Sequence, residues 1–91
     1  MYHSPLLIQV AQAAESSRPQ ESIRIYVDAA KRLIQARGRD NYTMAAGHLV
    51  RVRKLYKRLG EDKTWQALIA DIRQQNGSLR ALKEELNKVG L

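Results

Sequence analysis

The sequence predicts an all-α fold of four to five antiparallel helices, arranged as a small bundle or as a helical-hairpin array resembling tetratricopeptide repeats. Apolar residues recur at three- and four-residue spacings along the chain, and no stretch alternates as a strand would. The connections between predicted helices are only about two to four residues long, which favours antiparallel packing of successive helices. The 91 residues are therefore expected to form a single helical domain spanning 1–91.

The first helix is expected over about 5–16. Ser4 and Pro5 suit its N-cap and first helical positions, because a serine side chain can accept a free backbone N–H and proline has none to satisfy. After a short break, Ser17 is predicted to cap the second helix. The apolar side of the first helix consists of Leu6, Leu7, Val10, Ala11 and Ala14.

The second helix is expected over about 19–37, and its apolar residues span more than half of the helical circumference. Such a helix must contact neighbours on two sides, so it is predicted to be the central helix, flanked by the first and third. Gly38 is expected to end it in a left-handed conformation, which glycine adopts at little cost. Its apolar residues are Ile23, Ile25, Tyr26, Val27, Ala29, Ala30, Leu33, Ile34 and Ala36.

The third helix is expected over about 41–59, with Asp40 or Asn41 as its cap and Gly60 after its end. Its apolar residues share one face, the pattern of a helix that lies on a core. That face consists of Tyr42, Ala45, Leu49, Val52, Leu55, Tyr56 and Leu59.

The fourth and fifth helices are expected over about 62–75 and 79–89. Glu61 and Asp62 place negative charge at the start of the fourth helix, where it interacts favourably with the helix dipole. Ser78 is predicted to cap the fifth helix. The apolar faces consist of Trp65, Leu68, Ile69 and Ile72 in the fourth helix and Leu79, Leu82, Leu86 and Val89 in the fifth.

The positive charge is concentrated in the middle of the chain. Residues 31–58 hold nine Lys or Arg side chains and one acidic side chain, whereas the rest of the chain holds seven basic and eight acidic ones. The whole formal net charge of +7 therefore comes from the middle segment. Such asymmetry favours a polyanionic partner.

A basic stripe on the third helix is the candidate binding site. Gly47, Arg51, Lys54 and Arg58 share the side opposite the apolar face, and Lys57 lies beside them. These side chains could contact successive phosphates or a protein partner, and Gly47 would allow a close approach of the partner's backbone. Two other interpretations remain open. The stripe could be a solvated face that maintains solubility, or Gly47 could be buried against another helix or a partner.

No catalytic or metal-binding constellation is present, so we expect no enzyme activity, no cofactor and no metal. Cys is absent, which excludes disulfides and thiolate ligands and is consistent with a cytoplasmic protein. His3 and His48 are far apart, and His48 is interpreted as a histidine at the margin of the apolar face. The serines lie at predicted helix ends or in first turns, where capping explains most of them. Four aromatic residues fall on apolar faces and are expected to pack in the core: Tyr26, Tyr42, Tyr56 and Trp65.

Several stretches resemble the C-terminal helical region of bacterial SWIM-type zinc-finger proteins. They are RPQESIRIYVDAAKRLI, GRDNYTMAAGHLVRVRKLYKRLG, the Trp65 segment with LIADIR, and LRALKEELNKVGL, which together cover nearly all of the chain from Arg18. These are packing patterns, and none is a catalytic signature. The zinc finger of that family needs Cys-x-Cys and Cys-x-His, which this chain lacks, so zinc binding is not implied. The resemblance implies the helical region without the finger, acting as an accessory interaction region.

Together these observations predict a non-catalytic helical protein-interaction module, an accessory region of a larger nucleic-acid-related protein. It would bind through the exposed side of the second and third helices or through an uncovered end of the array. The alternative is direct, sequence-nonspecific binding of nucleic acid through the basic face of the 41–59 helix. A protein partner is expected and no membrane association is, because no apolar run is long enough to span a bilayer.

Overall fold

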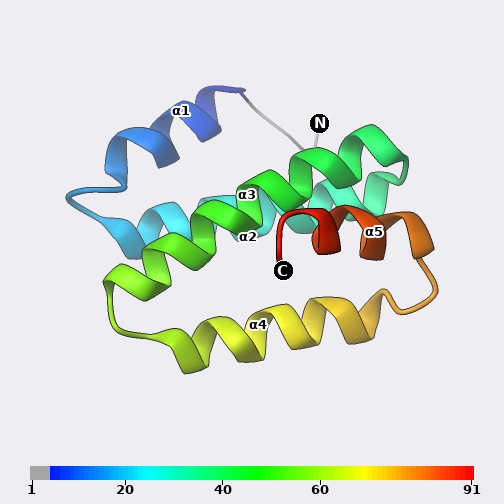
Figure 1. Cartoon of the computed structure of the whole chain (residues 1–91). Coiled ribbons are helices and arrows are strands. Elements are labelled where there is room, and N and C mark those ends of the chain that lie inside the picture. The colour runs from blue at the N-terminus through cyan, green and yellow to red at the C-terminus, as the bar shows by residue number, and fades with distance from the viewer. Residues whose placement is uncertain (1–4) are drawn as a thin grey trace.

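The structure is a computed structural model that describes residues 5–91, and it is all-helical over that range, as predicted. Five helices follow one another (Figure 1): α1 (Pro5–Ala14), α2 (Pro19–Ala36), α3 (Arg39–Arg58), α4 (Asp62–Gln75) and α5 (Arg80–Lys88). Each helix begins and ends within two residues of its predicted limits. His3 and the predicted cap Ser4 lie outside the described residues.

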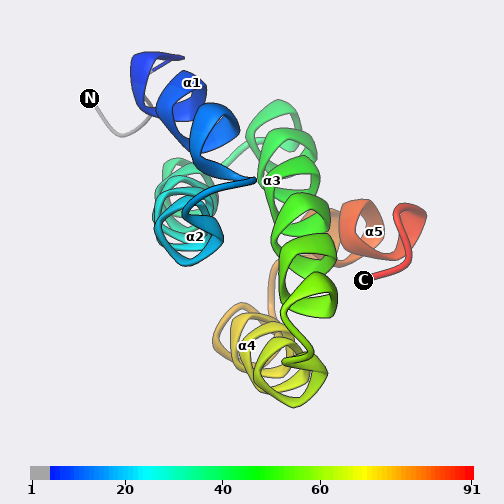
Figure 2. The same cartoon turned by 90° about the vertical axis from the view of Figure 1, so that its left-hand side faces the viewer.

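Helix α3, and not α2, is the centre of the bundle. α1 and α3 pack against α2, as predicted, but α3 contacts α2, α4 and α5. Figure 2 shows α3 with these three helices around it. α5 was expected to pack beside α4, yet it packs mainly on α3. The correction has a physical reason: at 20 residues α3 is the longest helix, and its small Ala45 and Ala46 let neighbours approach on two sides.

The core is built around the middle of α3. Leu49 and Val52 are completely buried there, and Tyr26 of α2, Trp65 of α4 and Leu86 of α5 reach the same cluster from three other helices. Burial of each such side chain contributes roughly 1.5–3 kcal/mol of transfer free energy. Tyr42 is buried as expected, whereas Tyr56 is only half-buried at the edge of the core.

The predicted helix caps are wrong in detail. Ser17, Asp40 or Asn41, and Ser78 were expected to cap α2, α3 and α5. The N-cap positions are instead held by Arg18, Gly38 and Leu79, and none of them makes a side-chain cap hydrogen bond. The helices start one or two residues away from the capping side chains, so packing of the apolar faces decides the register rather than local capping.

Two positions explain how the first three helices are joined. The α2–α3 connection is Arg37 and Gly38 alone, at φ 67° and 101°, so Gly38 takes the left-handed conformation predicted for it. Ser22, in the first turn of α2, is completely buried, and its hydroxyl donates to the Ala11 carbonyl of α1 at 2.6 Å. It therefore ties α1 to α2.

Glu85 of α5 joins the last helix to the start of α3. Its carboxylate accepts three hydrogen bonds: from Arg39 Nη1 at 2.7 Å, from the Thr43 hydroxyl at 3.0 Å and from Lys88 Nζ at 3.0 Å. The side chain is buried, and the neighbouring Glu84 forms a second ion pair with Arg39 at 2.8 Å. Lys88 first, then Thr43 and Arg39, lower the pKa of Glu85 against the opposing effect of burial. We call this cluster the Glu85 joint.

Candidate interaction surface

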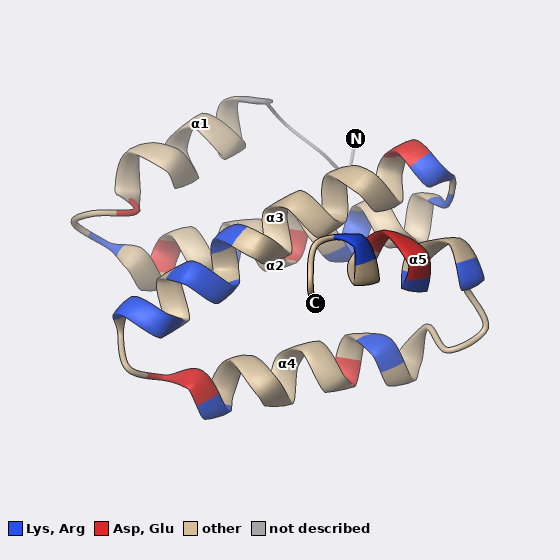
Figure 3. Ribbon diagram, in the orientation of Figure 1, with Lys and Arg blue, Asp and Glu red and all other residues tan. Residues whose placement is uncertain are grey.

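Four of the five predicted site residues line one groove on α3. Gly47, Arg51, Lys54 and Arg58 meet there, while Lys57 lies outside. The groove has a volume of about 560 Å³, and we call it the basic groove. Figure 3 shows the Lys and Arg segments gathered along the C-terminal half of α3. The other residues that line the groove are Glu15, Val50, Leu55 and Val89.

A carboxylate that the sequence did not indicate lies at the edge of this groove. Glu15, just after α1, accepts hydrogen bonds at one oxygen from the Tyr26 hydroxyl at 2.5 Å and from Arg51 Nη1 at 2.9 Å. Arg58 donates to the Glu15 backbone carbonyl. Burial, followed by the contact with Glu15, raises the pKa of Tyr26 to about 12. We call this cluster the Glu15 joint.

The basic residues of α3 therefore fall into two groups. Arg51 and Arg58 hold Glu15, and Arg53 donates to the Gly90 carbonyl at 3.0 Å. Lys54 and Lys57 are exposed, and within residues 5–91 the structure pairs neither with a carboxylate. The three arginines thus have contacts within the described chain, whereas neither lysine forms an ion pair there.

Gly47 is not buried against another helix of the described chain. It is exposed in the middle of α3, and a Cβ atom built there would meet nothing within 4 Å. No backbone or side chain of residues 5–91 therefore requires glycine at this position. A glycine in a helix interior costs roughly 0.5–1 kcal/mol relative to alanine.

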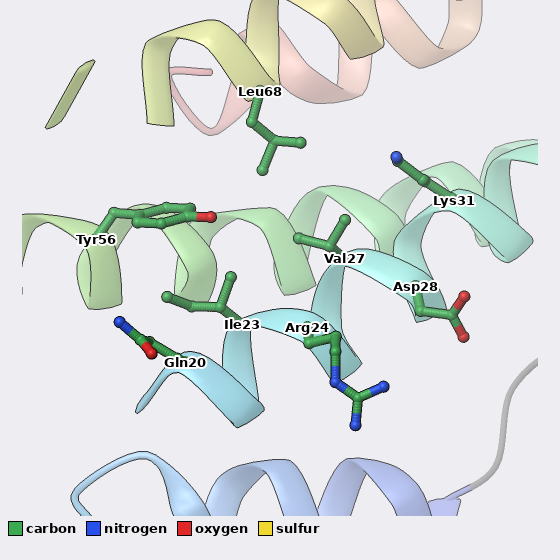
Figure 4. A pocket seen from close by; sticks show the side chains of 8 residues that line it. All are labelled: Gln20, Ile23, Arg24, Val27, Asp28, Lys31, Tyr56 and Leu68. Atoms are coloured by element: carbon green, nitrogen blue, oxygen red, sulfur yellow. The ribbon is translucent and has the colours of Figure 1, made fainter. Parts of the chain in front are cut away.

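A second groove lies between α2 and α4, and Tyr56 is the one residue of α3 that lines it (Figure 4). Its volume is about 420 Å³, and we call it the α2–α4 groove. Val27 and Leu68 face each other across it from opposite helices, and the ring of Tyr56 lies at one end. The remaining lining residues are Gln20, Ile23, Arg24, Asp28 and Lys31.

The sequence interpretation missed the α2–α4 groove, although it contained a relevant signal. The apolar arc of α2 is wider than α1 and α3 can cover, and this leaves Val27 half-buried at the groove. Arg24 and Lys31 of α2 line the α2–α4 groove and not the basic groove, so the charged residues of α2 and α3 share no groove.

Of the two histidines, only His48 lies within the described residues. His48 is half-buried at the margin of the apolar face, and its ring stacks on that of Tyr26 with the centroids 5.7 Å apart. Among residues 5–91, no three His, Asp or Glu side chains gather as ligands of a metal ion would. None of the helices over this range combines the length and the apolar character needed to cross a bilayer.

The chain is similar to a short segment of a longer bacterial protein. No protein-family model matches the sequence, and no solved structure matches it. Over 73 residues the chain is 34% identical to the uncharacterized protein YwqB of Bacillus subtilis (strain 168). This alignment covers 80% of the chain but 14% of YwqB. The chain thus corresponds to a small part of a much longer relative.

Proposed function

We propose that this chain is a non-catalytic helical protein-interaction module. The observation that carries the proposal is the α2–α4 groove, whose apolar floor is formed by Ile23, Val27 and Leu68 with the Tyr56 ring at one end. Arg24, Asp28 and Lys31 of α2 provide charged groups along its rim.

An apolar floor beside a charged rim is the usual composition of a protein-binding surface. The lining residues of α2 extend from Gln20 to Lys31, so the groove follows the axis of α2 for about three turns. An amphipathic helix fits such a groove, with its apolar residues between Val27 and Leu68. Tyr56 supplies an aromatic ring with a polar hydroxyl, the type of side chain that often dominates binding energy.

We further propose that the module is an accessory region of a larger nucleic-acid-related protein in the cytoplasm. The match to 14% of the length of YwqB supports an accessory role. The resemblance to the helical region of SWIM-type zinc-finger proteins supports the link with nucleic acid. The absence of Cys supports a location in the cytoplasm, where disulfides are rare.

The test is a selection of helical peptides from a displayed library against the protein. We expect selected peptides to lose about tenfold or more in affinity when Val27→Glu or Leu68→Glu places a charge in the groove. Gln74→Glu, an exposed change on α4 outside both grooves, is the matched control and should leave affinity unchanged. Failure to enrich any peptide, or equal binding by all variants, would contradict the proposal.

Direct nucleic-acid binding is the second candidate function, and the unpaired positions of Lys54 and Lys57 favour it. If it is correct, affinity for a duplex falls steeply as salt rises from about 50 to 200 mM. Lys54→Gln with Lys57→Gln should then reduce the slope of log affinity against log salt by about two. Lys63→Gln with Lys83→Gln removes the same charge elsewhere and is the control. The absence of binding at low salt would eliminate this function.

A further inference from the structure

We propose that the basic groove is a second docking site, which receives an acidic amphipathic helix of a protein partner. The partner's carboxylates would contact Arg51, Lys54 and Arg58, and its apolar residues would lie over Gly47 between Val50 and Val89. This site uses different residues from the α2–α4 groove and does not depend on it.

The basic groove already holds one carboxylate, that of Glu15. The Glu15 carboxylate accepts hydrogen bonds from Arg51 at 2.9 Å and from the Tyr26 hydroxyl at 2.5 Å. Arg58 donates to the Glu15 backbone carbonyl. The Arg51 guanidinium is thus already oriented for a carboxylate oxygen, and that of Arg58 for a carbonyl oxygen. Arg51 is half-exposed and Lys54 carries no partner within residues 5–91, so both have donors left for a second carboxylate.

Gly47 provides the second argument. The glycine weakens α3 and leaves open space above the helix, although nothing in the described chain uses that space. Close approach of two helices requires small residues at the contact, so Gly47 suits a helix from another protein. Met44, one turn earlier on the same side, is 41% exposed and extends the apolar contact.

The apolar side chains in the basic groove favour an acidic amphipathic helix over nucleic acid as its occupant. Val50 is half-buried and Val89 is 39% exposed, and apolar side chains of this kind contribute little to binding a phosphate backbone. A mixed apolar and basic groove is complementary to a helix with one apolar and one acidic side.

The experiment uses three labelled probes with the full chain. They are an amphipathic helical peptide with leucine on one side and glutamate on the other, its counterpart with lysine in place of glutamate, and a duplex DNA of similar length. We expect the glutamate peptide to bind and the lysine peptide to fail. Equal binding of both peptides, or no binding of the glutamate peptide, would overturn the proposal.

Two variants locate the site without damaging the fold. Gly47→Leu fills the groove while increasing helix propensity, so binding should fall by about tenfold or more with the thermal midpoint unchanged or higher. Glu15→Gln removes the competing carboxylate and should strengthen binding of the glutamate peptide. Ala70→Leu, at an exposed position of α4, is the control for an added leucine. If Gly47→Leu still binds the glutamate peptide as tightly as the wild type, the proposed site is wrong. If the protein prefers the DNA duplex and Gly47→Leu abolishes that binding, the groove is a nucleic-acid site instead.

Discussion

Two glutamates hold opposite ends of α3 in different ways. Glu85 of α5 lies at the N-terminal end, where its buried side chain, 7% exposed, meets Arg39, Thr43 and Lys88. Glu15 lies at the C-terminal half, where its side chain is 22% exposed and borders the basic groove. The Glu85 joint is enclosed by the residues that it connects, whereas the Glu15 joint opens onto a surface where another carboxylate could compete.

The difference separates a structural ion cluster from one that can also take part in binding. The Glu85 carboxylate is itself buried and makes three contacts that would be lost together, while its partners Arg39 and Lys88 remain largely solvated. A cluster at a groove edge is partly solvated, so its loss costs less and its arginines can pair with other anions. Variants of α3 and of the two glutamates can rank these contributions to the free energy of unfolding.

The largest effect should come from Leu49→Ala, which removes the fully buried side chain between the two joints. Loss of transfer free energy and the cavity left behind should lower the free energy of unfolding by about 2–5 kcal/mol. Urea denaturation monitored by circular dichroism measures it. A smaller effect than that of either glutamate variant would show that the joints, and not the core, dominate stability.

Glu85→Gln should be next, since it leaves Arg39 and Lys88 without the buried negative charge. The folded-state pKa of Glu85 is lowered, so its contribution is present above the unfolded pKa of about 4.3 and is lost as pH falls through the lower folded value. The thermal midpoints of wild type and variant should thus differ clearly at neutral pH and converge in acid. Equal differences at both pH values would contradict the assigned charge interaction.

Glu15→Gln should have a smaller effect, about 0.5–1.5 kcal/mol, because glutamine keeps a hydrogen-bond acceptor at a partly exposed site. The variant should also lower the pKa of Tyr26 from about 12, although burial, the larger cause, keeps it above the ordinary value. Because the folded pKa is raised, stability is full below about pH 10 and decreases as pH rises toward 12. Ultraviolet titration measures the pKa of Tyr26, and the Tyr26→Phe variant assigns the signal. An unchanged pKa in Glu15→Gln would show that Glu15 does not affect the ionisation of Tyr26.

The smallest effect should be a gain. Gly47→Ala should raise the free energy of unfolding by about 0.5–1 kcal/mol, because alanine favours the helix and its Cβ meets nothing within 4 Å. Since Gly47 belongs to neither joint, the gain should be the same when Glu15 or Glu85 is changed, as double-variant cycles can measure. A loss of stability would mean that the chain itself needs glycine here.

The helices could be predicted from the sequence because each carries its own apolar periodicity. The meeting of Gly47, Arg51, Lys54 and Arg58 could be predicted for the same reason, since one helix positions all four. The pairing of Arg51 with Glu15 could not, because these residues are 36 positions apart and only the packing of α1 against α2 brings them together. The α2–α4 groove likewise depends on how far two helices stand from each other, which periodicity does not encode.

The position of α3 at the centre has a consequence for the order of folding. α1, α2 and α3 are successive and connected by short turns, so their contacts close small loops at little entropic cost. The contact between Arg39 and Glu85 joins residues 46 positions apart and can form only after the chain has turned back along α4. α5 should therefore dock last and detach first, uncovering Leu82, Leu86 and the side of α3 that they cover.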